Sequence, residues 1–495
     1  MNAHEVPLGR LLLPDGELSR SDLDVRAEAL AAELRRQGLA RGDLVICPVG
    51  DATAEFVVMQ IALARNHCAL LPIDNQLDTT ELRQLAAQTG VDWVWEPTHP
   101  TTQRRGQGQM DHGHLLSTGL APKQSRSADA DSADAGQGSA LALVVRTSGS
   151  SGGCKAAMLS AAALQTSCER INQRLGLGCE DLWLCALPRQ HIGGLAIGYR
   201  CALAGAGMLL HGRFDAARVA ADLWRHPVTH LSLVPAMLAR LLAQCPRPPQ
   251  WLRVVLIGGQ ALDRGLARRA LVAGWPLLLG YGMTETCSFI ASRVLDEHGE
   301  QSLQPLPDVQ LEAPRCARES GALPLRLRAP MLMLGYANPE RRPGLGLDDQ
   351  GWLQTADLAC LKDTSFLRIM GRADDQLVIA GVNVQPGLIE ESISDLEGVS
   401  QCALVGVPEP VWGQTLVALY QGSIGVDALE CWCREHLPSP QRPRLLVPIK
   451  DWPLLASGKE DRTRLREIAT KTLSAKGAHL NVPLEQTHTG VGGSA

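Results

Sequence analysis

Helix-like and strand-like segments alternate along the first part of the chain. Apolar residues recur at helical spacing between Leu23 and Gly38, and residues 44–49 form a short β-like run that ends at Gly50. The same order then repeats, with helices expected at residues 56–65 and 79–87 and strands at residues 69–72 and 93–95. Because helices commonly connect parallel strands, this alternation predicts an α/β fold with a parallel sheet and helices on its faces.

The pattern changes twice further along the chain. Strands and helices alternate to about Gly280, turn-rich strand-like sequence runs over residues 293–368, and a new set of elements begins after Arg372. The 495 residues exceed the ~250–300 at which a single core usually stops growing. We therefore expect a large N-terminal domain of layered αβα subdomains with a small β-rich subdomain, residues 1–372, and a smaller domain over residues 373–474.

Two segments have the composition of loops. Residues 101–138 are rich in Gln, Gly, Ser, Asp and Ala, and residues 475–495 resemble a fraying tail. Such segments bury too little apolar surface to offset the entropy of ordering. We expect a flexible surface excursion in the first case and a flexible tail in the second.

Composition and charge exclude several classes of protein. The net charge is -5, which argues against a protein that binds the phosphate backbone of nucleic acid. The most apolar stretch, residues 193–210, is interrupted by Arg200 and rich in Gly, so we expect no membrane span. The N-terminal residues do not resemble a signal peptide, and the 14 Cys lack the paired spacing of a zinc site. We expect a cytoplasmic protein with free thiols that acts on small molecules.

A turn rich in Gly and Ser follows a continuous buried strand that ends near residue 145. The turn runs through Thr147, Ser148, Gly149, Ser150, Ser151 and Gly152 to Lys155. Backbone amides beside glycines, hydroxyl groups and a lysine together suit a polyphosphate. A Walker A loop would need Gly at position 154 and Ser or Thr at 156, where Cys154 and Ala156 stand. A plain Gly/Ser linker is the other alternative.

This turn resembles the signature of the adenylate-forming superfamily, which includes acyl-CoA synthetases, luciferases and the adenylation domains of peptide synthetases. The superfamily pattern is roughly [ST]-S-G-[ST]-[ST]-G-x-P-K-G, from which Cys154 and Ala156 depart. Further motifs of the superfamily follow in the expected order, and the resemblance extends from about Leu23 to Arg466. It implies a two-domain fold whose smaller C-terminal α+β domain is a mobile lid.

The segment Gly280-Tyr281-Gly282-Met283-Thr284-Glu285 resembles the superfamily's Y-G-x-T-E motif, which binds the nucleotide. The resemblance implies that Tyr281 stacks on adenine, Thr284 contacts the α-phosphate and Glu285 holds Mg²⁺. Upstream, the turn Gly258-Gly259-Gln260 is similar to the adenine-binding turn. A capping Thr and a surface Glu are the structural alternative for the first of these motifs.

Two acidic motifs follow. Trp352-Leu353-Gln354-Thr355-Ala356-Asp357 resembles W-x-x-T-G-D, and Gly371-Arg372-Ala373-Asp374-Asp375 resembles G-R-x-D-D. By resemblance, Asp357 binds the ribose hydroxyls, Arg372 meets ribose and phosphate, and Asp374 is the hinge between domains. Ordinary charged turn residues are the alternative.

The remaining motifs concern the acyl group. By resemblance, Lys459 neutralises charge at the α-phosphate, His191 lies between the acyl pocket and the thiol tunnel, and Gly381 lines that tunnel. Within the superfamily, the segments around His191, Pro235 and Thr284 are similar to those of o-succinylbenzoate-CoA ligases. Gly193 and Phe289 depart from that group, so the substrate is left as an aryl or related small carboxylic acid.

The resemblance implies a ligase that uses ATP, Mg²⁺ and coenzyme A. A carboxylic acid would be converted to an acyl-adenylate with release of pyrophosphate, and the acyl group would pass to the thiol of coenzyme A. Three alternatives remain: transfer to the phosphopantetheine of an acyl carrier protein, a nucleotide-binding regulator that has lost catalysis, and a P-loop hydrolase. A homodimer also fits the sequence.

Overall fold

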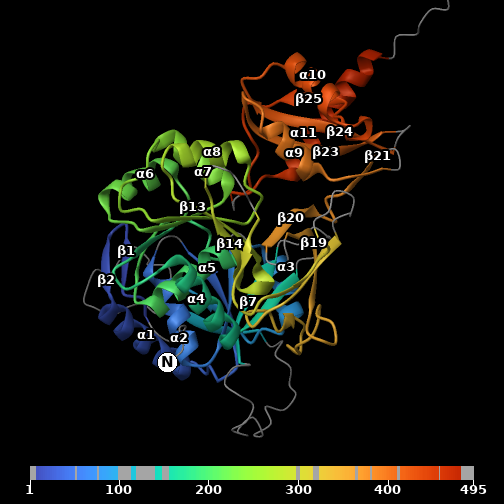
Figure 1. Ribbon diagram of the computed structural model, residues 1–495. Coiled ribbons are helices and arrows are strands. Elements are labelled where there is room, and N and C mark those ends of the chain that lie inside the picture. The colour runs from blue at the N-terminus through green and yellow to red at the C-terminus, as the bar shows by residue number, and fades with distance from the viewer. Residues whose placement is uncertain are drawn as a thin grey trace, which may run out of the picture. The chain divides into compact units, whose positions relative to one another are not determined.

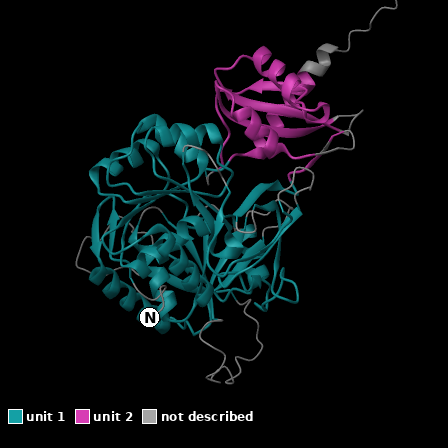
Figure 2. Ribbon diagram, viewed as in Figure 1, with its two compact units in different colours: residues 1–374, 456–459 teal, residues 375–455, 460–495 magenta. Residues whose placement is uncertain are grey.

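The computed structural model divides the chain into two compact units. Unit 1 comprises residues 1–374 with 456–459, and unit 2 comprises residues 375–455 with 460–495 (Figure 2). The structure describes residues 7–50, 53–74, 77–97, 113–118, 140–147, 155–296, 302–315, 323–362, 366–379, 382–409, 413–455 and 458–480. Among these residues, no helix is both long and apolar enough to cross a membrane.

Unit 1 contains a nine-stranded sheet. In spatial order its strands are β15 (Gln304–Pro305), β14 (Ser288–Val294), β13 (Leu277–Met283), β12 (Val254–Ile257), β11 (His230–Leu233), β9 (Leu182–Cys185), β10 (Gly207–Leu210), β1 (Arg10–Leu13) and β2 (Gly16–Ser19). Neighbouring strands from β13 to β1 are parallel, whereas β14, β15 and β2 pair antiparallel at the edges. The carboxyl ends of β9, β12 and β13 therefore lie at one edge of the sheet.

A seven-stranded sheet forms the second layer of unit 1. Its spatial order is β18 (Gly335–Tyr336), β8 (Lys155–Ser160), β7 (Leu141–Thr147), β4 (Ala69–Asp74), β3 (Leu44–Val49), β5 (Trp93–Glu96) and β6 (His114–Ser117). Strands β7, β4, β3 and β5 are parallel to their neighbours in this order. On β7, Leu143 and Val145 belong to one core cluster and Val144 to another, because both faces of the sheet are covered.

Helices fill the space between and around these sheets. They are α1 (Arg20–Arg36), α2 (Ala54–Arg65), α3 (Thr79–Thr89), α4 (Ala161–Leu175), α5 (Ile192–Ala204), α6 (Ala216–Arg225), α7 (Pro235–Gln244) and α8 (Arg264–Val272). Helix α4 contacts β7 and β8, α5 contacts β9 and β10, and the two helices contact each other (Figure 1). The pair α4 and α5 thus joins the two sheets through one shared core.

The β-rich region predicted for residues 293–368 contains an antiparallel four-stranded sheet. Its order is β16 (Gln310–Glu312), β17 (Leu323–Arg328), β19 (Leu353–Lys362) and β20 (Phe366–Arg372). Asp357 on β19 is paired in register with Arg372 on β20. Two of the predicted site residues are therefore brought together by strand pairing alone.

Unit 2 has its own sheet and its own cores. A hairpin of β21 (Leu377–Ile379) and β22 (Val382–Val384) precedes the sheet of β23 (Val399–Glu409), β24 (Gly413–Gly422) and β25 (Leu445–Pro448). The helices are α9 (Pro386–Ser394), α10 (Val426–His436) and α11 (Arg462–Leu480), with a short 3-10 turn, η4, at Ser439–Gln441. Two hydrophobic clusters fill this unit.

Several sequence expectations are wrong in detail. Residues 114–117, inside the predicted excursion, form β6 because they pair antiparallel with the apolar strand β5. The first residues of the predicted tail continue α11 to Leu480. Cys360 on β19 is disulfide-bonded, so the expectation of free thiols fails there. The rest of the excursion and the tail beyond residue 480 lie outside the described residues.

Candidate active site

Asp357 connects three segments of unit 1. Its Oδ2 accepts a hydrogen bond of 2.6 Å from the Tyr281 hydroxyl, and its Oδ1 accepts one of 2.9 Å from Arg372 Nη1. The residue is only 8% exposed. Burial, followed by the Asp357 charge, raises the pKa of Tyr281 well above its usual range. The phenol therefore stays protonated and donates to the carboxylate.

Arg372 holds a second carboxylate at the end of β20. Its Nε and Nη2 donate to the two oxygens of Asp374 at 2.8 and 2.9 Å. A guanidinium group matches a carboxylate in this two-pronged geometry. One chain of hydrogen bonds thus links Tyr281, Asp357, Arg372 and Asp374, which the sequence predicts to bind adenine and ribose and to form the hinge.

A second chain joins the lysine after the phosphate loop to the predicted metal ligand. The Lys155 ammonium lies 5.0 Å from the centre of the Tyr336 ring, and the Tyr336 hydroxyl donates to Glu285 Oε1 at 2.8 Å. Thr147 Oγ1 donates to the Lys155 carbonyl at 3.3 Å, across the start of the β7–β8 hairpin. Ser148, Gly149, Ser150, Ser151 and Gly152 lie outside the described residues.

Glu285 stands in a tightly held 3-10 turn, η3 (Thr284–Thr286). The buried Thr286 hydroxyl accepts from the Met283 N–H at 3.0 Å and lies 2.7 Å from the Ser288 carbonyl, to which it donates. Cys287 and Ser288 have φ values of 55° and 137°, which L-residues rarely adopt. Strain of this kind persists only where surrounding contacts fix the backbone, and it concentrates at functional sites.

The glycines of the predicted nucleotide motifs allow close packing of backbones. A Cβ at Gly282 would lie 2.0 Å from the Ser288 carbonyl oxygen, and one at Gly258 would lie 3.3 Å from the Gly280 carbonyl oxygen. Gly259 has φ +80°, and a Cβ there would lie 3.5 Å from Lys459 Cε. The turn Gly258-Gly259-Gln260 after β12 therefore lies beside the predicted catalytic lysine.

Lys459 acts electrostatically on His191. Burial, assisted by Arg372, lowers the pKa of Lys459. Desolvation lowers the pKa of His191. The positive charges of Lys459 and Arg146 lower it further, whereas the negative charge of Asp74 raises it. His191 is the N-cap residue of α5 and makes no capping hydrogen bond through its side chain. Its ring is therefore available as a neutral group near the lysine.

The predicted magnesium site contains one carboxylate, that of Glu285. Within the described residues, no group of three or more His, Cys, Asp or Glu side chains could hold a metal ion. Mg²⁺ usually takes one or two carboxylates and completes its shell with phosphate oxygens and water. Glu285, whose Oε1 accepts a hydrogen bond from Tyr336 and whose Oε2 has no partner among the described residues, fits that mode of binding.

Two residues of this region were not recognised from sequence. Tyr336 follows a glycine in a turn-rich segment, which gives no chemical signal. Arg200 interrupts an apolar stretch of the sequence, yet it is 1% exposed and lies 5.6 and 5.7 Å from the rings of Trp183 and Phe289. Its Nε and Nη2 have no hydrogen-bond partner in the described part of the chain.

Burial lowers the pKa of Arg200 to about 10, so the side chain remains a cation at neutral pH. An unpaired buried charge is costly unless a partner neutralises it. The side chain comes from α5, the helix whose N-cap position is occupied by His191. Arg200 therefore marks a place where an anionic group would be stabilised.

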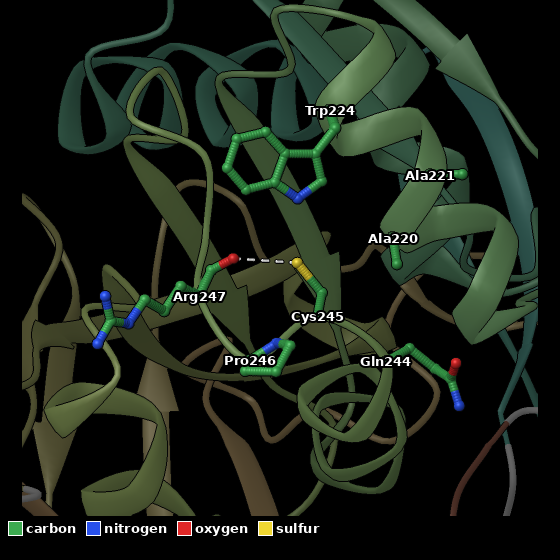
Figure 3. A pocket seen from close by; sticks show the side chains of 7 residues that line it. All are labelled: Ala220, Ala221, Trp224, Gln244, Cys245, Pro246 and Arg247. Carbon is green, nitrogen blue, oxygen red and sulfur yellow. Dashed lines mark hydrogen bonds between the residues drawn. The ribbon is translucent and has the colours of Figure 1, made fainter.

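The pocket in Figure 3 lies elsewhere on unit 1. It has a volume of about 500 Å³ and is formed by residues of α6, including Trp224, by the last residue of α7 and by the segment that follows. In that segment the Cys245 thiol donates to the Arg247 carbonyl at 3.0 Å (Figure 3). None of the predicted site residues lines it. Gly381, the predicted tunnel residue, lies outside the described residues.

Glu460 follows Lys459 in sequence and belongs to unit 2, where Arg462 Nη2 lies 2.8 Å from Glu390 and 3.7 Å from Glu460. Burial, reinforced by Glu390, raises the pKa of Glu460 to about 7 from an ordinary value of 4.5. Between these pH values the folded state keeps a proton that the unfolded chain releases. The stability that this proton contributes is complete below about pH 4.5 and is lost as pH rises through about 7.

We expect Glu460→Gln to stabilise unit 2 by about 1–3 kcal/mol at pH 8 and to have little effect at pH 5. Amide hydrogen exchange in β23 and β24 measures the change. Glu467→Gln, at a more exposed position on α11, is the matched control. An equal effect of Glu460→Gln at both pH values would contradict the assignment.

Comparison with known proteins places the chain in a family. The profile of the AMP-binding enzyme family matches residues 4–316, and that of the AMP-binding enzyme C-terminal domain matches residues 388–459. The 2-succinylbenzoate–CoA ligase of Bacillus pumilus is 30% identical over 59% of this chain and 62% of its own length. The enzyme of the same name from Bacillus licheniformis is 31% identical over 66% of this chain and 69% of its own length. The matches thus span about two thirds of these relatives.

Solved structures share the fold over nearly the whole chain. The o-succinylbenzoate CoA synthetase MenE from Bacillus subtilis, in complex with OSB-AMP, gives a TM-score of 0.74 at 23% identity and covers 93% of this chain and 95% of its own. ATP-bound MatB from Rhodopseudomonas palustris gives 0.77 at 23% identity, with coverage of 95% and 100%. From the two profile matches and this shared fold, we conclude that the chain belongs to the AMP-binding enzyme family.

Proposed function

We propose that this protein is an AMP-forming acid–CoA ligase. It joins a carboxylic acid to the AMP part of ATP, releases pyrophosphate, and transfers the acyl group to the thiol of coenzyme A. The observation that carries the proposal is the pair of chains Tyr281–Asp357–Arg372 and Lys155–Tyr336–Glu285, which link five separate sequence segments in unit 1. The names of the sequence relatives support the same reaction.

The chemistry follows from the weakness of a carboxylate as an electrophile. Loss of oxide is prohibitive, whereas an acyl-adenylate loses AMP readily when a thiol attacks. Adenine is held by Tyr281 and by the turn Gly258-Gly259-Gln260. Asp357 and Arg372 hold the ribose. Lys155 and the loop before it hold the phosphates. Thr284 lies at the α-phosphate. Holding the acid and the α-phosphate together converts a bimolecular step into one within a complex.

Charge develops at the α-phosphate when the carboxylate attacks. Lys459 places a cation there, and a preorganised charge in a partly desolvated site stabilises that charge more strongly than water does. Mg²⁺, when bound at Glu285, supplies further neutralisation of the phosphates. His191, held neutral by its surroundings, separates the acid from the thiol path without adding charge.

Transfer to the thiol requires the lysine to leave and the thiol to enter. We assign residues 1–372 to the catalytic domain, residues 373–474 to a mobile lid and Asp374 to the hinge. The division between the two units after Asp374 supports this hinge position. Gly381 on the lid would line the thiol path, and residues 475–495 would remain a tail.

The acid that fits best carries an aromatic ring and a second anionic group. Arg200 offers a buried cation between Trp183 and Phe289, where such a group would be neutralised. Ligases of o-succinylbenzoate, the sequence relatives, are named for an acid of this kind. Phe289 in place of a polar residue then serves as an apolar wall beside the guanidinium group.

Pyrophosphate release across a panel of acids, with and without coenzyme A, tests the proposal. We expect release with o-succinylbenzoate and slower release with benzoate, which lacks the second carboxylate, and we expect coenzyme A to consume the adenylate. An acyl carrier protein as the obligatory acceptor would appear as adenylate that coenzyme A leaves intact. ATP binding without pyrophosphate release would favour a regulator that has lost catalysis.

We place the reaction in the cytoplasm, where ATP and coenzyme A are supplied together. Buried free thiols such as Cys47, Cys168 and Cys185 fit a reducing compartment, whereas the disulfide at Cys360 does not. We keep the homodimer as a proposal, which sedimentation of the purified protein tests directly.

A further inference from the structure

Tyr336 occupies a fixed position beside Lys155. It lies on β18, which pairs antiparallel with β8 so that Tyr336 faces Ala157. Lys155 is two residues before Ala157 and therefore lies on the same face of β8, diagonal to Tyr336. The Lys155 ammonium is 5.0 Å from the ring centre, a distance at which a cation is attracted to the face of an aromatic ring.

The opposite end of the ring reaches the metal-binding turn. The Tyr336 hydroxyl donates to Glu285 Oε1 at 2.8 Å, and the backbone N–H of Met333, three residues earlier, donates to the Glu285 carbonyl at 2.7 Å. One short segment therefore holds Glu285 by both its side chain and its main chain. The bond leaves Oε2 of the carboxylate for another partner.

The surrounding loop is shaped around the ring. Gly346 has φ +90°, and a Cβ there would lie 2.5 Å from Tyr336 Cδ2. The Tyr336 N–H donates to the Leu345 carbonyl at 2.7 Å, and the Gly344 N–H donates to the Leu334 carbonyl at 2.8 Å. Burial, followed by the Glu285 charge, raises the pKa of Tyr336 above its usual range, so the hydroxyl keeps its proton.

We propose that Tyr336 is a positioning residue that aligns the Glu285 carboxylate for magnesium-bound ATP and holds the Lys155 ammonium toward the phosphates. The inference rests on the proposed function, because it takes Glu285 and Lys155 as the groups that face the metal and the phosphates. It assigns different tasks to the two ends of the side chain. The hydroxyl acts through Glu285, and the ring acts through Lys155.

Two substitutions separate these tasks. Tyr336→Phe removes the hydroxyl and keeps the ring under Lys155, whereas Tyr336→Leu removes both. Tyr420→Phe is the matched control, since Tyr420 lies in unit 2 and its hydroxyl donates to the Ile424 carbonyl there, at 3.4 Å. Isothermal titration with ATP in the presence and absence of Mg²⁺ measures binding without turnover.

We expect Tyr336→Phe to weaken ATP binding about tenfold with Mg²⁺ and to leave binding without Mg²⁺ nearly unchanged, because a hydrogen bond to a charged group is lost. Tyr336→Leu should weaken binding under both conditions, and Tyr420→Phe under neither. KM for magnesium-bound ATP should rise more than kcat falls. Far-UV circular dichroism and melting temperature verify that each variant is folded.

Equal weakening by Tyr336→Phe with and without Mg²⁺, or wild-type binding under both conditions, would overturn the inference. Failure of the proposed function gives a different result, since wild-type protein would then release no pyrophosphate with any acid. A folded Tyr336→Leu variant that binds metal-free ATP as well as Tyr336→Phe does would remove the role of the ring.

Discussion

Lys459→Ala will lower the rate of adenylate formation by about 10²–10³-fold, the loss typical when one preorganised donor at a developing charge is removed. Thioester formation from preformed acyl-adenylate will remain largely intact, because that step no longer involves attack at the α-phosphate. Lys459 lies beside Gly259 in unit 1, on the nucleotide side of the site. Single-turnover measurements of the two half-reactions separate the effects.

The pH dependence of adenylation provides an independent measure of the same residue. Because burial and Arg372 lower the pKa of Lys459, the lysine loses its charge at a lower pH than an ordinary lysine does. The rate of adenylate formation will therefore decline with rising pH earlier than for an unperturbed lysine. Lys450→Ala, at an exposed position, is the control and should leave both half-reactions unchanged. Equal loss of both half-reactions in Lys459→Ala would contradict the assigned role.

Asp357→Asn will raise KM for ATP by about 10–100-fold, since hydrogen bonds to a charged group contribute about 1.5–3 kcal/mol. The substitution removes the charge that the Tyr281 hydroxyl and Arg372 both contact. Tyr281→Phe deletes one of those bonds and keeps the aromatic ring, so its effect will be smaller. Steady-state kinetics of pyrophosphate release at varied ATP concentration give both values.

Asp374→Asn is the control for Asp357→Asn, because Asp374 is the other carboxylate that Arg372 holds and is more exposed. It will change KM for ATP less than Asp357→Asn does. A double-mutant cycle with Tyr281→Phe and Asp357→Asn will show non-additive effects if the two residues act as one unit. A lower melting temperature with unchanged KM would instead make Asp357 a purely structural residue.

Much of the fold could be predicted from local patterns. The run at residues 44–49 is strand β3 with the predicted bounds, and the helices expected at residues 56–65 and 79–87 are α2 and α3, the second of which is capped by the Asp78 side chain. These predictions succeed because hydrophobic periodicity and capping depend on neighbouring residues alone. Strand β6 was missed because its partner β5, rather than its own composition, orders it.

Local sequence patterns predicted only part of the candidate active site. Motif order indicated Tyr281, Glu285, Asp357 and Lys459, whose assigned roles remain proposals. Tyr336 and Arg200 carried no local signal, since a tyrosine after a glycine and an arginine in an apolar helix are each common. Their importance arises from the groups around them. Tyr336 has a carboxylate at 2.8 Å, and Arg200 has two aromatic rings but no counter-charge among the described residues.

The sequence by itself determined the alternation of helices and strands, the family and the chemical types of the groups that meet the nucleotide. Those properties depend on residue identity and short spacing. Only the tertiary structure decided that Asp357 faces both Tyr281 and Arg372, and that Glu285 is held by a tyrosine fifty-one residues further along the chain. Strand order and register set such pairings, and they depend on how all the strands pack together rather than on any one segment.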